Sequence, residues 1–147
     1  MSLKTDLFFA RSCRRLSIME TTEGRVFNTG RDEISEEEDK IPYIIITNDG
    51  TQNQEESKDS EVESDYDNDT VSVLVVSDTR SHLAELAEEV RKSVKQDVED
   101  MEMDKDMAKE FGFLINDYSF SASAVEYDPS KPCFFQTLTY ICETINY

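Results

Sequence analysis

The sequence predicts an α+β protein in which two main helices lie on one face of a small, largely antiparallel sheet. Three observations carry this prediction: β-branched apolar runs at 41–47 and 71–76, helical periodicity over 81–101, and strand-like alternation over 118–127. The expected order is ββα–ββα, a two-layer sandwich that buries the apolar side of each element against the other layer. At 147 residues the chain has room for one such domain.

The domain is expected to span residues 42–147, after a disordered N-terminal segment over 1–41 that is first basic and then acidic. Residues 1–16 carry four Lys/Arg against one Asp, whereas residues 17–70 carry 17 Asp/Glu against four Lys/Arg. Such polar stretches bury too little apolar surface to offset the entropy of ordering them. We therefore also expect a disordered acidic loop over 51–69, although so long a loop is unusual inside a compact domain.

The first half of the domain is predicted from its apolar pattern. The run IPYIIIT at 41–47 is β-like and is followed by turn-forming Asn48, Asp49 and Gly50, and VSVLVV at 71–76 is the second strand. Apolar residues then recur at three- and four-residue steps over 81–101, as they do on one face of a helix. A further helical turn over 104–111 ends at Gly112, a suitable left-handed cap.

The second half of the domain is expected to be a hairpin and a closing helix. Residues 113–115 and 118–127 predict two strands, joined by a turn at Asn116 and Asp117. Pro132 suits the first turn of a helix that would place Phe134 and Leu138 on one face. The many β-branched and aromatic residues of this last segment leave a strand open as the alternative.

Charge and composition restrict the class of protein. A formal net charge of −18 repels phosphate and disfavours nucleic acid as a partner, whereas a protein partner with a basic face is favoured. No apolar run is long enough for a secretory signal or a membrane span, so a cytoplasmic or nuclear protein is expected. The alternative is mitochondrial, because residues 2–19 resemble a presequence apart from Asp6. The scattered Cys13, Cys133 and Cys142 indicate neither a disulfide framework nor a zinc site.

Enzymatic activity, a metal and a cofactor are not expected. The one histidine, His82, lies at the start of the predicted helix rather than beside a candidate nucleophile, and no glycine-rich phosphate loop is present. Asp65, Asp67 and Asp69 match the first ligand positions of a calcium-binding loop. Thr70 and Val76 stand where that loop needs its glycine and its closing glutamate.

The motif RRLSI at 14–18 is the clearest short signal. Arg14 and Arg15 stand three and two residues before Ser17, and Ile18 follows it, which is the substrate pattern of basophilic kinases. This pattern resembles that of the cyclic-AMP-dependent kinase, so such a kinase is an expected partner. Phosphate on Ser17 would add nearly two negative charges beside the arginines. Ser35, Ser60 and Ser64 each have an acid three residues on, as acidophilic kinases prefer.

The aliphatic run within 71–76 has a second interpretation. Val73, Leu74, Val75 and Val76 follow a stretch with many acids and phosphorylatable serines, and this pattern resembles a SUMO-interacting motif. The resemblance implies that the run docks as an added strand while the acids meet a basic rim. The acids concerned are Glu61, Glu63, Asp65, Asp67 and Asp69. The simpler interpretation is a core strand, because an exposed run of this kind is prone to aggregation.

These observations together predict a small, acidic, intracellular regulatory or adaptor protein. It would bind a protein partner with a basic surface by electrostatic steering and an apolar strip, and phosphorylation would tune the binding. Two alternatives stay open: a sheet-edge ligand at 71–76 for a SUMO-like module, and a viral antagonist of a host factor, which would have the same sequence features.

Overall fold

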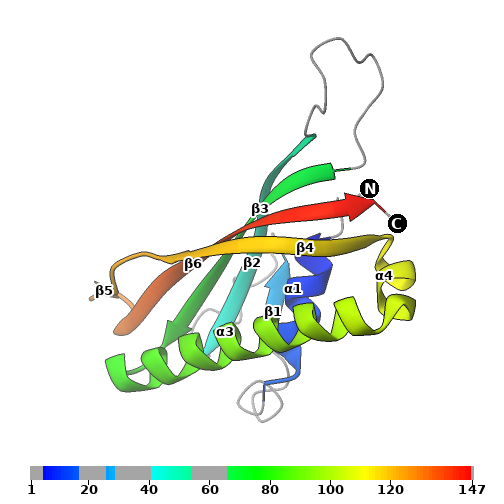
Figure 1. Cartoon of the computed structure of the whole chain (residues 1–147). Helices are drawn as coiled ribbons and strands as arrows, with labels where there is room; N and C mark the ends of the chain where they lie inside the picture. The colour runs from blue at the N-terminus through cyan, green and yellow to red at the C-terminus, as the bar shows by residue number, and fades with distance from the viewer. Residues whose placement is uncertain (1–4, 17–25, 29–40, 54–65, 147) are drawn as a thin grey trace.

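The computed structural model describes residues 5–16, 26–28, 41–53 and 66–146 (Figure 1). The elements are, in order, α1 (Thr5–Arg14), β1 (Val26–Asn28), β2 (Tyr43–Asn53), β3 (Tyr66–Ser77), α3 (Arg80–Met103), α4 (Lys105–Phe111), β4 (Phe113–Ala122), β5 (Glu126–Asp128) and β6 (Cys133–Asn146). The strands form one sheet in the order β1-β2-β3-β6-β4, with β5 also beside β6. Among the strand pairs of the described residues, only β1–β2 is parallel. The predicted mixture of helices and a mostly antiparallel sheet is confirmed, but the order of elements differs from ββα–ββα.

Strand β3 lies inside the sheet and is longer than expected. It pairs with β2 along one edge and with β6 along the other, so the predicted strand at 71–76 is confirmed. Residues 51–53 and 66–69, which the sequence analysis placed in a disordered loop, lie in the β2–β3 ladder instead. The ladder continues through a bulge between Asn48 and Gly50. Gly50 has a φ of 147°, which suits glycine, and the expected turn does not end β2. Residues 54–65 lie outside the described part of the chain.

The prediction of a closing helix from Pro132 onward is wrong, because residues 133–146 form the 14-residue strand β6. This strand pairs with β3 on one side and with β4 and β5 on the other. Its β-branched and aromatic side chains suit a pleated surface with two neighbours. The expected hairpin turn at Asn116 and Asp117 is also absent. Strand β4 runs through these residues with a register shift between Ile115 and Asp117.

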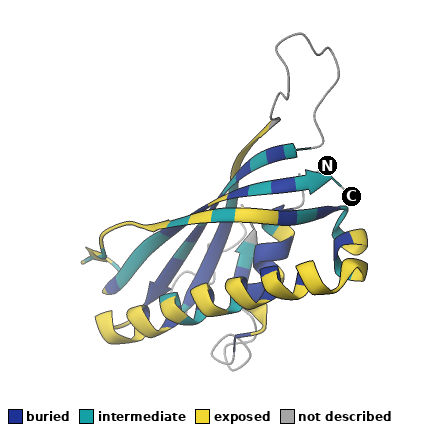
Figure 2. Cartoon of the chain, viewed as in Figure 1, coloured by how far each residue is buried: buried dark blue, intermediate teal, exposed yellow. Residues whose placement is uncertain are grey.

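Helices α3 and α4 agree with the sequence. Thr79 is the N-cap of α3, and its side chain accepts a hydrogen bond from the backbone N–H of His82 at 3.1 Å. Leu83, Leu86, Val90 and Val94 are buried against the sheet, while the opposite side of α3 is exposed (Figure 2). Gly112 ends α4 in the left-handed conformation, with a φ of 84°.

Helix α1 lies where the sequence analysis expected an unstructured arm. It packs beside α3, and Phe8, Phe9 and Cys13 are buried in the main core together with residues of β2, β3 and β6 (Figure 1). A ten-residue helix is unstable alone in water, so this packing supplies its stability. A smaller apolar cluster, formed by Tyr43, Ile45, Val76 and Cys133, lies apart from the main core.

Candidate protein-binding site

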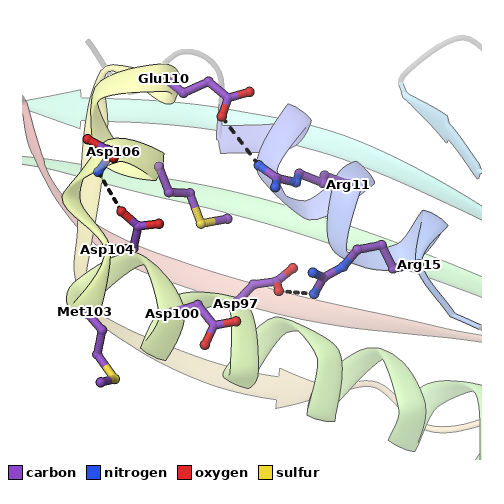
Figure 3. Close-up of a pocket in the computed structure, with 9 residues that line it drawn as sticks. Arg11, Arg15, Asp97, Asp100, Met103, Asp104, Asp106 and Glu110 are labelled. Carbon is purple, nitrogen blue, oxygen red and sulfur yellow. Dashed lines mark hydrogen bonds and ion pairs between the residues drawn. The ribbon is translucent and has the colours of Figure 1, made fainter.

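A cleft of about 530 Å³ lies between α1 and the corner where α3 meets α4 (Figure 3). We call it the acidic cleft because five of its lining residues are acids and two are arginines. The lining residues are Arg11, Arg15, Asp97, Asp100, Met103, Asp104, Asp106, Met107 and Glu110.

The α3–α4 corner holds two of these acids in place. Asp104 ends α3 with its backbone N–H, which donates to the carbonyl of Asp100 at 2.8 Å, and it begins α4 with its side chain, which accepts from the N–H of Asp106 at 3.1 Å. A carboxylate at a helix N-terminus also interacts favourably with the helix dipole. The local fold therefore keeps Asp104 and Asp106 at one end of the cleft.

Asp97 differs from the other acids because its side chain is only 1% exposed. Its Oδ2 accepts a hydrogen bond from Ser12 Oγ at 2.5 Å, and its Oδ1 pairs with the guanidinium of Arg15. Ser93, one turn earlier on α3, donates to the carbonyl of Ser12 at 2.9 Å. These contacts attach the C-terminal end of α1 to α3.

The rim of the cleft is open to solvent. Arg11 Nη1 lies 3.8 Å from Glu110 Oε2, and its guanidinium lies 5.7 Å from the centre of the Phe111 ring. Met103 is 89% exposed and is the most exposed large apolar residue of the described part of the chain. The cleft thus presents carboxylates beside a flexible thioether, which together suit a basic segment with an apolar side chain.

His82, Cys13 and Cys142 do not line the acidic cleft. His82 lies near the other end of α3, where its Nδ1 is 2.8 Å from Asp78 Oδ1. Burial raises the pKa of the Cys13 and Cys142 thiols to about 12, so neither is an activated nucleophile. Among the described residues, no three or more His, Cys, Asp or Glu side chains lie close enough together to hold a metal ion.

The arginines of the predicted kinase motif are both engaged. Arg14 Nη2 donates to the carbonyl of Val26 at 3.4 Å, and Arg15 pairs with Asp97. The candidate acceptors Ser17, Ser35, Ser60 and Ser64 lie outside the described residues, and phosphorylation of each stays a prediction.

The predicted partner-binding residues of β3 are largely buried. Val73, Val75 and Val76 are in the core, and Leu74 is half-buried. Because both edges of β3 are paired, docking of this run as an added strand would require it to leave the sheet. Glu61, Glu63 and Asp65 lie outside the described residues.

Asp67 and Asp69, from the same predicted set, are 5% and 0% exposed, so neither lies on the surface as a ligand for a basic rim. Asp69 Oδ2 accepts a hydrogen bond from Thr5 Oγ1 at 2.6 Å and lies 3.4 Å from Thr144 Oγ1. These contacts join the N-terminal end of α1 to β3 and β6.

Sequence reasoning missed the acidic cleft. Asp97, Asp100 and Asp104 follow one another at three- and four-residue steps, which is a readable signal for one helix face. The opposite wall is α1, which was not predicted to fold, so the cleft could not be anticipated.

Comparison with models of known protein families gives no match, and comparison with curated proteins gives none either. Within the described residues, no helix is both long enough and apolar enough to span a bilayer.

Proposed function

We propose that this protein is a non-enzymatic regulatory or adaptor protein that binds a basic segment of a protein partner in the acidic cleft. The observation that carries the proposal is the cleft itself, in which five acids surround a hollow beside the exposed Met103. The proposal keeps an intracellular location and tuning by phosphorylation near Ser17, as the sequence analysis expects.

Electrostatics supports this function. The net charge of −18 steers a cationic partner toward the molecule, and a cleft focuses the field of the charges that line it. The affinity should fall as salt is added, because surface charges are screened over about 8 Å at physiological ionic strength. Met103 would add apolar contact that salt does not screen.

The test compares two variants with equal loss of charge. In the first, Asp100, Asp104 and Asp106 are replaced by Asn, which retains the capping ability of residue 104. In the second, Glu85, Glu88 and Glu89 of the N-terminal half of α3 are replaced by Gln. Binding of a labelled oligo-arginine peptide is measured by fluorescence anisotropy at low and at high salt.

The cleft variant should bind at least about tenfold more weakly, while the Glu-to-Gln variant should lose only the small general effect of net charge. Equal losses in the two variants would show that the peptide senses overall charge, and would overturn the cleft as the binding site.

A further inference from the structure

We propose that Arg15 is an intramolecular competitor, which occupies at Asp97 the position that an arginine of the partner would take. This inference rests on the proposed function and adds to it the recognised chemistry, a guanidinium group, together with an autoinhibitory contact. The observation behind this inference is the ion pair between the Arg15 guanidinium and Asp97 Oδ1 within the acidic cleft.

Asp97 is fixed without the help of Arg15. Its other oxygen accepts from Ser12 Oγ at 2.5 Å, and Ser93 Oγ ties the carbonyl of Ser12 to α3 at 2.9 Å. The carboxylate would therefore stay in place if Arg15 moved away. One oxygen of a buried acid would then face the cleft without its cation, which is a costly arrangement that a second guanidinium relieves.

The position of Arg15 allows a guanidinium of the partner to replace it at Asp97. It follows the last residue of α1, Arg14, so its side chain can leave Asp97 without unwinding the helix. Its side chain is 49% exposed, whereas the Asp97 side chain is 1% exposed, so the guanidinium is the accessible member of the pair. Water can hydrate a displaced Arg15, and this lowers the free-energy cost of exchange.

The chemistry favours arginine over lysine in the partner. A guanidinium presents several N–H donors in a fixed plane and is weakly hydrated, so it pairs with a buried carboxylate more readily than an ammonium does. The acids at Asp100 and Asp104 would meet the remaining positive charges of the segment.

The test measures the affinity of labelled oligo-arginine and length-matched oligo-lysine peptides for four forms of the full chain. These are the wild type, Arg15→Gln, Arg11→Gln and the double variant Arg15→Gln/Asp97→Asn. Arg11→Gln is the matched control, because it removes the same charge from the same cleft without touching Asp97.

The Arg15→Gln variant should bind oligo-arginine roughly fivefold more tightly than the wild type, the scale of one partly exposed ion pair. The increase in affinity from Arg11→Gln should be smaller. The double variant should lose the additional affinity that Arg15→Gln shows over Arg11→Gln. The gain should also be smaller for oligo-lysine. If Arg15→Gln gains no more than Arg11→Gln, or gains equally with both peptides, the competitor role is overturned.

Docking of α1 is checked by alkylation of Cys13, which is 0% exposed and reacts only when α1 opens. If Arg15→Gln makes Cys13 reactive, the Arg15→Lys variant is measured instead. An affinity for oligo-arginine between those of the wild type and Arg15→Gln supports the competitor role, and an affinity equal to that of the wild type overturns it. The proposed function fails separately, when the Asp100/Asp104/Asp106→Asn variant binds oligo-arginine as tightly as the Glu85/Glu88/Glu89→Gln control.

Discussion

Asp97 Oδ2 on α3 lies 2.5 Å from Ser12 Oγ on α1, although 85 residues separate them in the chain. At the other end of α1, Thr5 Oγ1 lies 2.6 Å from the buried carboxylate of Asp69. The short helix α1 is thus attached at both ends by buried acids from distant elements. These two contacts hold the wall of the acidic cleft.

Replacing Asp97 by Ala should lower the free energy of unfolding by about 2 kcal/mol. The change removes the acceptor of Ser12 and the partner of Arg15, and Arg15 recovers part of the loss by hydration. Asp100→Ala, at an exposed neighbouring position on α3, should change the free energy of unfolding by no more than about 0.5 kcal/mol. Urea unfolding of both variants checks this, and equal losses would contradict a structural role for Asp97.

Replacing Phe9 by Ala should cost about 3–5 kcal/mol of stability, because its ring is fully buried and lies 4.8 Å from the ring of Tyr140. Leu7→Ala on the same helix is the control, since Leu7 is 46% exposed, and its cost should stay below about 1 kcal/mol. Thermal or urea unfolding distinguishes them. A small effect of Phe9→Ala would mean that α1 contributes little to the folded core.

Replacing Tyr140 by Phe should leave the free energy of unfolding unchanged or raise it by up to about 1 kcal/mol. The Tyr140 hydroxyl is buried and has no hydrogen-bond partner among the described residues, and its pKa is raised, chiefly by burial. Removing an unsatisfied buried hydroxyl relieves a desolvation penalty, while the ring keeps its aromatic contacts. A clear loss of stability in urea unfolding would reveal a partner for the hydroxyl.

The pKa of His82 should lie above its usual value of 6.5, because the hydrogen bond with Asp78 stabilises the charged imidazolium. A pKa raised by folding means that this contribution to stability is complete below 6.5 and is lost as the pH rises through the folded-state value. His82 is the one histidine, so its NMR titration is unambiguous. In Asp78→Asn the pKa should fall back toward 6.5, and an unchanged titration would refute the pairing.

Local patterns in the sequence were sufficient for the elements whose signals are unambiguous. Helix α3 follows from its repeated apolar face, and the end of α4 follows from Gly112, because these features act within a few residues of the chain. The β-branched runs that became the centres of β2 and β3 are equally local.

The sequence alone also determined the strong acidity of the chain and the α+β class. The tertiary structure decided which of two possible conformations each ambiguous segment adopts. Residues 133–146 suit either a helix or a strand, and pairing with three strands selects the strand. Residues 5–14 are too short to form a stable helix alone, and burial of Phe8 and Phe9 selects the helix. The tertiary structure likewise decided that Asp67, Asp69 and Asp97 are buried. The sequence does not distinguish an acid that is solvated from one that is paired inside the fold.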